Sequence, residues 1–305
     1  MDDAQLQAFD RIMREGSFGR AARALGISQP AISARIQNLE HETGHPLFIR
    51  GRRGPALTHF GEAFLPYVRR ALAVLDEGIE AARETGQGGR GRITLGSIES
   101  LAGGFLASAI ARFATRYPRI ELFVQTGHSD QVVTMLDDGL VKLGLVTWPL
   151  LDERIVPLLR FREPLILVTY PGHALANDGP WTLDDAVALA QPFLLVRWGS
   201  PFNDAIGRVL EGNERMLELP TWTIRELLLR GVGAAFLTRT LIERELRDGT
   251  LVEVPVEQPH ALARESALIS LRQPSLPAAA SAFIDTLRLE AGPLSLRDEP
   301  RPQRA

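Results

Sequence analysis

The front of the chain places its apolar residues with the period of short amphipathic helices. Leu6, Phe9 and Met13 are three and four residues apart, and Gly16 follows as a residue that readily ends a helix. Ser17 can then cap a second helix, because its hydroxyl can accept a hydrogen bond from a backbone N–H of the first turn. The apolar positions of this second helix are Phe18, Ala21, Ala22 and Leu25. The pattern therefore predicts two short helices before residue 26.

A third helix is expected after a turn of three residues, 26–28, with Ser28 as its cap. So short a turn between two helices is what a helix-turn-helix requires. At about 100° per residue, Ile32, Ile36 and Leu39 cluster on one side of the third helix and would pack inward.

The outer side of this third helix is polar and slender. It presents Pro30, Ser33, Ala34, Gln37 and His41, with Gln29 and Asn38 at its flanks. A helix that enters the major groove of DNA needs such a face, because short side chains allow close approach and amides or hydroxyls can pair with base edges. A solvated helix on any protein surface would show the same pattern, so this face alone leaves both interpretations open.

Three arginines follow at the tip of a glycine-rich turn. Residues 46–49 indicate a short strand, and the turn of residues 50–55 contains Arg50, Arg52 and Arg53. Arginine at such a tip can neutralise phosphates or enter a minor groove. A charged loop tip is usually only solvated, but its position directly after a helix-turn-helix favours contact with DNA as the wing of that motif.

A long helix is expected from Thr58, which can cap it, to about Thr85, a length of roughly 40 Å. Its apolar residues form a seam with spacings of three and four: Leu65, Val68, Leu72, Leu75, Ile79 and Ala82. A helix this long with one apolar stripe is expected to pair with a second copy and so to dimerise. Packing of the stripe against its own domain is the alternative. The glycine-rich residues 86–91 predict a flexible hinge.

From residue 92 onward, short apolar runs alternate with helical patterns, which is typical of an α/β domain. The runs lie at residues 93–96, 120–125, 144–147, 165–169, 193–196, 234–237 and 268–271. One compact sheet of this length needs fewer strands, whereas two lobes with a cleft between them would use them all. Residues 293–305 are polar and rich in proline and arginine, and we expect them to be disordered.

Charge is distributed unevenly along the 305 residues. Residues 1–58 carry eight arginines against six acidic residues, a net charge of +2, whereas the remainder carries 26 basic against 31 acidic residues, a net charge of −5. The positive end therefore coincides with the predicted helix-turn-helix.

Cysteine is absent, which excludes disulfides, thiolate nucleophiles and cysteine metal sites. No apolar run approaches the length of a membrane span and the first residues are acidic, so we expect a cytoplasmic protein.

The predicted helix-turn-helix and wing match a known signature in register and without gaps. The matching residues are Ala21, Ala22, Leu25, Ser28, Gln29, Ser33, Ile36, Leu39, Glu40, Gly44, Leu47, Phe48, Arg50, Leu57, Thr58 and Gly61. On these residues the chain resembles the LysR-type transcriptional regulators. Residues 92–96, 231–233 and 251–254 resemble that family's effector domain in outline.

The resemblance implies an α+β multidomain protein with a winged helix-turn-helix, a long dimerising linker helix and a two-lobed α/β effector domain like a periplasmic binding protein. The implied divisions are residues 1–58 for DNA binding, 59–91 for the linker helix and hinge, 92–292 for the effector domain, with lobe I at 92–163 and 266–292 and lobe II at 164–265, and a tail at 293–305. It also implies a homotetramer on two DNA half-sites that activates or represses transcription according to a small bound ligand, with RNA polymerase as a further partner.

The same resemblance assigns roles at the DNA surface. Gln29, Pro30 and Ser33 would meet bases, while Arg50 and Arg53 would serve the DNA backbone or minor groove. The full set of candidate DNA contacts is Ser28, Gln29, Pro30, Ser33, Ala34, Arg35, Gln37, Arg50, Arg52 and Arg53. Many relatives have arginine where this chain has Ala34, so a guanine contact from that position is missing and base preference is open.

Candidate effector-binding residues lie where strands end and helices begin, because free amides and the helix dipole favour anions there. The candidate residues are Ser97, Ile98, Glu99, Ser100, Thr126, His128, Thr147, Trp148, Arg197, Trp198, Thr221 and Trp222. Three tryptophans among them lead to the hypothesis of an aromatic or apolar acid whose carboxylate is held by Arg197 or by helix-end amides. Core packing is the more frequent explanation for any one tryptophan, and Glu99 would instead favour a cationic ligand.

Catalysis finds little support in the sequence. The six histidines show no metal-ligand spacing, and neither a phosphate loop nor a GxSxG pattern is present. We therefore expect no enzymatic activity and no cofactor beyond the small effector. A second alternative keeps the DNA-binding domain and makes the rear domain an oligomerisation scaffold without a ligand.

Overall fold

The structure, a computed structural model, describes residues 1–49, 54–84, 91–103, 105–177, 179–200, 202–210, 215–257, 262–272 and 276–291. The wing arginines Arg50, Arg52 and Arg53, the hinge apart from Gly91 and the tail of residues 293–305 lie outside these ranges, so their predictions stay predictions. The chain forms two compact units: residues 1–88 with 134–141, and the rest.

The first unit is built on four helices. They are α1 (Asp3–Glu15), α2 (Phe18–Ala24), α3 (Gln29–Thr43) and α4 (His59–Glu84). Ser17 and Ser28 cap α2 and α3 as predicted, because each side chain accepts a hydrogen bond from the backbone N–H three residues on. Gly16 and Gly44 follow α1 and α3 with φ of 59° and 74°, a region that glycine adopts at little cost.

The core of the first unit confirms the predicted inner face of α3. Ile32, Ile36 and Leu39 are buried together with Phe9 of α1, and Phe9 meets the ring of Phe48 at 5.4 Å between centroids. The apolar period in the sequence therefore corresponds to one contiguous core.

The predicted wing has a paired stem. The backbone N–H of Ile49 donates to the carbonyl of Ala56 at 2.8 Å, and that of Thr58 donates to the carbonyl of Leu47 at 3.0 Å. Phe48 and Leu57 form the antiparallel bridge between the two segments. These bonds join the two described segments on either side of residues 50–53.

The apolar seam of α4 divides into two parts. Val68 is 1% exposed within the core of the first unit, and Leu65 and Leu72 pack against that core. Leu75 and Ile79 are 49% and 50% exposed. Packing against its own domain therefore accounts for the first part of the seam, whereas the second part faces solvent in this single chain.

The second unit contains one nine-stranded sheet. Its strands are β1 (Gly91–Ser97), β2 (Ile120–Thr126), β3 (Leu143–Thr147), β4 (Ile155–Thr169), β5 (Phe193–Leu195), β6 (Met216–Glu218), β7 (Ala234–Thr238), β8 (Val252–Val254) and β9 (Ala263–Leu271). The order is β2-β1-β3-β9-β4-β7-β5-β6, and β8 pairs with β4. Seven of these strands cover the predicted apolar runs; the exposed β6 has no apolar run that would reveal it.

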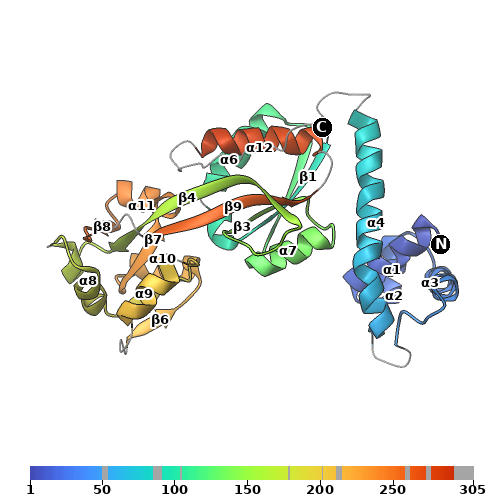
Figure 1. The fold of residues 1–305 in the computed structure, drawn as a ribbon, viewed down its shortest axis with the longest axis horizontal. Coiled ribbons are helices and arrows are strands. Elements are labelled where there is room, and N and C mark those ends of the chain that lie inside the picture. Colours follow the sequence, from blue (N-terminus) through green and yellow to red (C-terminus); the bar gives the residue numbers. More distant parts are fainter. Residues whose placement is uncertain are drawn as a thin grey trace. The chain divides into compact units, whose positions relative to one another are not determined.

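Two long antiparallel strands join the two lobes of this unit. β4 and β9 pair from Ile155 opposite Leu271 to Pro164 opposite Ala263, and β4 then pairs with β7 from Leu165 onward. Figure 1 shows both strands running side by side from the lobe with α6 and α12 to the lobe with α8 to α11. The change of partner beside Pro164 lies next to the lobe division predicted after residue 163.

Helices cover the sheet in both lobes. They are α5 (Glu99–Ala102), α6 (Phe105–Arg116), α7 (Ser129–Asp137), α8 (Leu183–Leu189), α9 (Phe202–Leu210), α10 (Thr221–Leu229), α11 (Glu243–Arg247) and α12 (Ala278–Glu290), with 3-10 turns η1 (Ala174–Ala176) and η2 (Arg239–Leu241). Each lobe has its own core: Phe113 meets Phe283 in lobe I, and Phe202 meets Phe236 in lobe II. Two cores in one sheet confirm the two-lobed arrangement.

Tight glycine turns explain one part of the sequence pattern. Gly233, which precedes β7, has a φ of 72°, and a Cβ built on it would lie 2.3 Å from the carbonyl oxygen of Pro192. Only glycine fits so close an approach of two backbones.

Across the described part of the chain, no helix is both long and apolar enough to cross a bilayer.

Candidate functional site

The outer face of α3 is open to solvent. Gln29, Pro30, Ala34 and Gln37 are exposed, and Ser33 is half-buried between them and the core side. Ser28 is exposed but its oxygen is occupied as the helix cap. Arg35 is half-buried on the flank of the helix. The face therefore offers amides and a hydroxyl at the surface, with no bulky apolar side chain among them.

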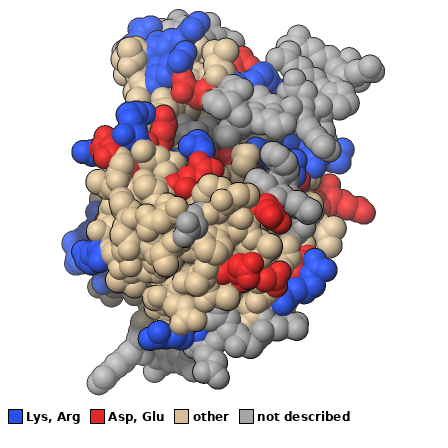
Figure 2. Space-filling model, turned by 90° about the vertical axis from the view of Figure 1, so that its left-hand side faces the viewer, with Lys and Arg blue, Asp and Glu red and all other residues tan. Residues whose placement is uncertain are grey.

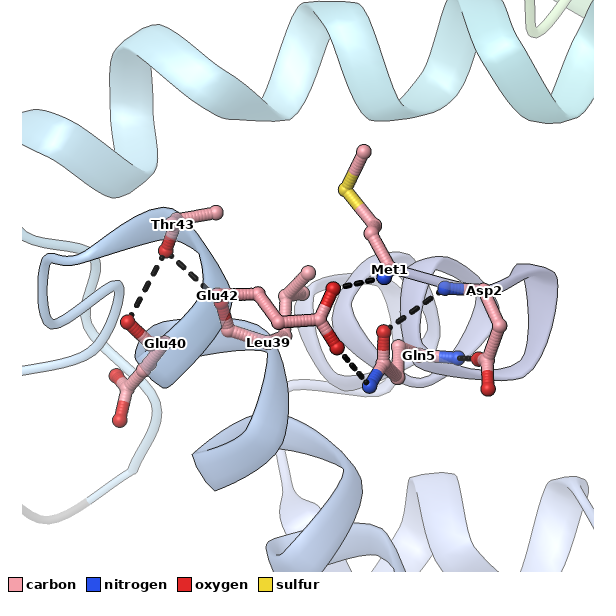
Figure 3. A network of polar contacts seen from close by, with 7 residues as sticks. All are labelled: Met1, Asp2, Gln5, Leu39, Glu40, Glu42 and Thr43. Carbon is pink, nitrogen blue, oxygen red and sulfur yellow. Dashed lines mark hydrogen bonds and ion pairs between the residues drawn. The ribbon is translucent and has the colours of Figure 1, made fainter.

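Both carboxylates near the end of α3 are bound to protein groups, and Figure 3 shows the contacts of Glu42. Glu42 pairs with the amino group of Met1 and accepts a hydrogen bond from Gln5 Nε2 at 3.1 Å. Glu40 Oε1 accepts the backbone N–H groups of Leu47 and Phe48 at 2.7 and 3.1 Å. Negative charge on this helix is therefore engaged in holding the domain together, which leaves the outer face compatible with an approaching phosphate backbone.

The surface of lobe II differs in its charged side chains from the outer face of α3. Figure 2, which looks onto this end of the sheet unit, shows acidic and basic side chains interspersed among uncharged ones. Its arginines pair with neighbouring carboxylates, as Arg239 does with Glu253 and Arg247 with Glu243 at 2.9 Å. Mixed charges of this kind give no broad positive field for nucleic acid.

A cavity of about 520 Å³ lies between the two lobes of the second unit. Its lining comes from the ends of β1, β2, β3 and β5, from the starts of α5, α7 and α10, and from β9. The volume falls within the range of about 300–1,000 Å³ that is usual for small-molecule sites. The cavity therefore lies at strand ends and helix starts, where the candidate effector-binding residues were expected.

Nine of the twelve candidate effector residues line this cavity. They are Ile98, Glu99, Ser100, Thr126, His128, Thr147, Arg197, Trp198 and Thr221. Ser97 is fully buried and donates its hydroxyl to the carbonyl of Ile98, while Trp148 and Trp222 are half-buried outside the lining. Of the three tryptophans behind the aromatic hypothesis, one therefore faces the cavity.

Trp198 and Trp222 are held by packing. The indole N–H of Trp198 donates to the carbonyl of Phe236 at 2.8 Å, and the ring belongs to the core of lobe II. Trp222 of α10 packs on Gly103 after α5, where a Cβ would lie 2.2 Å from the indole ring. Glycine at position 103 thus allows a close contact between a lobe I element and a lobe II element beside the cavity.

Arg197 already has a partner. Its guanidinium donates to Glu218 Oε2 at 2.9 Å, and both residues line the cavity. The hydrogen bond from Arg197 lowers the pKa of the Glu218 carboxyl, and Glu218 raises the pKa of Arg197. Both side chains are exposed, so solvent weakens the pair, but a ligand carboxylate at Arg197 would compete with Glu218.

Arg264 of β9 and Glu218 are charged residues of the cavity that were not predicted from the sequence, and Arg264 is the buried one. The side chain is 1% exposed; it pairs with Glu163 of β4, which is 2% exposed, and donates to Ser100 Oγ at 3.0 Å. Glu163 also accepts from Thr240, and Arg264 lies 5.2 Å from the ring of Trp198. Burial lowers the pKa of Arg264 to about 9, so the guanidinium remains charged at neutral pH.

No spacing pattern could have revealed Arg264. It lies within the strand run LARESALIS, and its partner Glu163 lies 101 residues earlier in the chain. The one available signal was two charged residues, Arg264 and Glu265, at the start of this strand segment, since a buried charge is paired or functional. Among the described residues, no cluster of histidine, aspartate or glutamate could hold a metal ion.

Two family models match the chain. Residues 4–62 match the bacterial regulatory helix-turn-helix protein model of the lysR family, and residues 86–292 match the LysR substrate binding domain. The curated relative IlvR, an HTH-type transcriptional regulator of Caulobacter vibrioides, is 34% identical over 271 residues, which are 84% of this chain and 90% of the relative.

Solved structures show the same fold over the full length. A full-length OxyR variant from Pseudomonas aeruginosa has a TM-score of 0.74 at 20% identity and covers 98% of this chain and 99% of its own. Full-length CbnR complexed with its target DNA has a TM-score of 0.67 at 21% identity and covers 95% of this chain and 100% of its own.

Proposed function

Because the chain belongs to the LysR-type family of bacterial transcriptional regulators, we propose that it is a ligand-responsive, sequence-specific DNA-binding regulator that acts as an oligomer on paired half-sites. The relatives are transcriptional regulators, so the protein regulates transcription and is not an enzyme. The observation that carries the DNA-binding assignment is the open polar face of α3, whose neighbouring carboxylates Glu40 and Glu42 are engaged within the domain.

Two kinds of DNA contact follow from this face. Gln29, Pro30 and Ser33 read base edges, with Ala34 and Gln37 beside them on the same side of α3. Arg35 and the wing arginines Arg50, Arg52 and Arg53 bind phosphates or the minor groove, and Ser28 fixes the start of the helix. Because alanine at position 34 offers no hydrogen bond, DNA shape contributes a larger share of the sequence preference.

The DNA-binding assignment is tested by separating affinity from specificity. The double substitution Arg50→Ala and Arg53→Ala is expected to weaken binding to every DNA sequence and to reduce its dependence on salt. Ser33→Ala or Gln29→Ala is expected to relax sequence preference while leaving binding to unrelated DNA unchanged. Unaltered binding by the double arginine variant would refute the wing contact.

The linker helix supports assembly through its second part. Leu75 and Ile79, exposed in the single chain, form the dimer seam, and Leu65, Val68 and Leu72 position the helix on the DNA-binding domain. Two such dimers form a homotetramer on two half-sites, and RNA polymerase is the partner through which the bound regulator changes transcription.

The effector binds in the cavity between the lobes. The support is the cavity's volume of about 520 Å³ and its many polar lining groups from both lobes. If the second unit were only an oligomerisation scaffold, no metabolite would raise its melting temperature. A thermal-shift screen of metabolites separates the two, because a ligand that binds the native state stabilises it by mass action.

An aromatic or apolar acid remains one candidate for the effector. Its support in the cavity is now Trp198, with Arg197 as the partner of a carboxylate. Titration of aromatic acids followed by tryptophan fluorescence tests it: a saturable change supports this class, and a flat signal with all such acids removes it.

A further inference from the structure

Two charged side chains of the cavity are available to a ligand. Arg197 and Glu218 engage each other at 2.9 Å, both from lobe II. Of the other arginine and glutamate side chains of the lining, Arg264 is paired with Glu163 but keeps an unpartnered Nε donor, and Glu99 has no partner among the described residues. A ligand can therefore use one guanidinium donor and one carboxylate.

Arg264 marks the anion-binding end. Its guanidinium uses one terminal nitrogen on Glu163 and the other on Ser100, but its Nε, a buried donor, has no acceptor. A buried donor without a partner is rare in folded proteins and often indicates a missing ligand or water. Because Arg264 also lines the cavity, we infer that a ligand oxygen is the acceptor for this donor.

The start of α10 favours an anion at the same place. Pro220 and Thr221 line the cavity, and Pro220 provides no side-chain cap to this nine-residue helix. The first N–H groups of a helix and its dipole attract a carboxylate or phosphate. Two independent features of the cavity thus favour a negative group.

Glu99 marks the cation-binding end. Its side chain is exposed at the start of α5 and lines the cavity, and no hydrogen bond or ion pair engages it within the described part of the chain. A free carboxylate in a partly enclosed site favours an ammonium group or another cation.

The sum of charges disfavours a simple anion. With Glu163 behind Arg264, the five charged side chains at the cavity, three glutamates and two arginines, have a net charge of −1. A bound monoanion would make the net charge −2 in a site partly shielded from water. A ligand that carries one charge of each sign leaves the net charge at −1.

We propose that the cavity binds a small zwitterion of the amino acid class, with its carboxylate at Arg264 and the start of α10 and its ammonium at Glu99. This proposal rests on the effector function proposed above. It replaces the aromatic acid as the preferred class, because one aromatic side chain lines the cavity while charged and polar groups make up most of the rest.

The test uses the full chain and three sets of compounds. The twenty common amino acids are each titrated by calorimetry and thermal shift, and every binder is compared with its deaminated acid and its decarboxylated amine. We expect at least one amino acid to bind saturably, and both of its analogues to bind at least 10-fold more weakly.

A matched pair of variants locates the ammonium. Glu99→Gln is expected to weaken binding of the amino acid at least 10-fold and to remove its advantage over the deaminated acid. Glu153→Gln makes the same change at an exposed glutamate outside the cavity and is expected to leave binding unaltered. Equal affinity in the Glu99→Gln and Glu153→Gln variants would contradict the placement of the ammonium.

A third variant locates the carboxylate. Arg264→Lys keeps the charge but loses the forked guanidinium, and we expect it to weaken the amino acid and its deaminated acid by the same factor. Its fold is checked by circular dichroism and thermal melting. If it does not fold, the Glu99→Gln comparison decides, since that side chain is exposed and has no hydrogen-bond or ion-pair partner among the described residues.

The remaining outcomes separate this proposal from the effector function. Deaminated acids that bind as well as amino acids, or amines that do so, overturn the zwitterion and leave a simple anion or cation site. If no amino acid binds, but another metabolite binds and alters the affinity for operator DNA, the zwitterion proposal is overturned and the effector function is kept. No binding by any compound removes both.

Discussion

Individual carboxylates and imidazoles stabilise this fold through hydrogen bonds that the pattern of polar and apolar residues does not reveal. Glu40 is the clearest case, because one carboxylate oxygen accepts two backbone N–H groups of the strand after α3. Those bonds join the helix that carries the polar face to the base of the wing. The sequence pattern alone gives Glu40 no such role, since the bond partners lie seven and eight residues away in a turn.

At this scale we predict that Glu40→Ala lowers the free energy of unfolding by about 1–3 kcal/mol, because two buried donors lose their acceptor. DNA affinity is expected to fall as well, since the wing loses its attachment to α3. Chemical denaturation and a DNA titration measure the two effects. Glu62→Ala, at an exposed site of α4, is the control, and equal stability of the two variants would contradict the role given to Glu40.

His173 makes stability depend on pH. Burial lowers its pKa, and its Nδ1 accepts the N–H of Leu175 at 3.1 Å, so the folded imidazole is neutral. In the unfolded chain histidine takes up a proton near about pH 6.5, so the unfolded state binds more protons below that pH. The fold therefore loses stability as pH falls from about 6.5 to the lower pKa of the folded imidazole.

We predict that the melting temperature falls more steeply between about pH 7.5 and pH 5.5 in the natural protein than in His173→Asn. Asparagine keeps an acceptor for the N–H of Leu175 but does not titrate. Melting curves across this range measure the difference between the two. Parallel pH profiles would show that His173 contributes nothing to the acid sensitivity.

At the scale of elements, periodicity and caps predicted the helices of the first unit almost to the residue. Ser17, Ser28 and Thr58 act as caps. They could be predicted because a cap depends only on residues that are close together in the sequence. Seven strands of the second unit were also visible as apolar runs; the exceptions are β6, whose residues are all exposed, and the three-residue β8. The length of β4 was missed because Arg160, Arg162 and Glu163 interrupt its apolar pattern before residue 165.

Helix α4 combines two interfaces in one apolar stripe. Sequence spacing predicted the stripe but could not divide it, since Val68 and Leu75 occupy equivalent seam positions. Only the tertiary fold shows that the core of the first unit ends near Leu72. The proposed dimer seam therefore begins at Leu75.

From this division we predict that Leu75→Glu combined with Ile79→Glu dissociates the oligomer without unfolding the DNA-binding domain, because both side chains are exposed in the single chain. Analytical ultracentrifugation gives the mass and circular dichroism the fold. Val68→Ala is the matched control, expected to lower stability but not the mass. An oligomer unaffected by the two glutamates would place the seam elsewhere.

At the scale of the whole second unit, the buried pair of Glu163 and Arg264 ties the crossing strands β4 and β9 to both lobes. Ser100 belongs to lobe I, and Thr240 belongs to lobe II. Sequence analysis predicted most of the cavity lining because strand ends and helix starts are local features. It missed this pair because only the register between β4 and β9 brings the two residues together.

We predict that Glu163→Ala lowers the free energy of unfolding by about 3–5 kcal/mol, because it leaves the guanidinium of Arg264 buried without its carboxylate. Thr240→Val removes one hydrogen bond from the same network and is expected to cost about 0.5–1.5 kcal/mol. Chemical denaturation of both variants gives the comparison. A loss for Glu163→Ala no larger than that for Thr240→Val would refute the pair as the link between the lobes.

In the proposed function, α3 is the helix that reads DNA sequence. Fluorescence anisotropy with an operator duplex, selected from genomic fragments by the protein itself, tests this directly against an unrelated duplex of equal length at the same salt concentration. We predict that the operator binds more tightly by a factor on the order of 10³ or more, and that Ser33→Ala reduces that ratio. Equal affinity for the two duplexes would contradict the assignment of α3 as a sequence-reading helix.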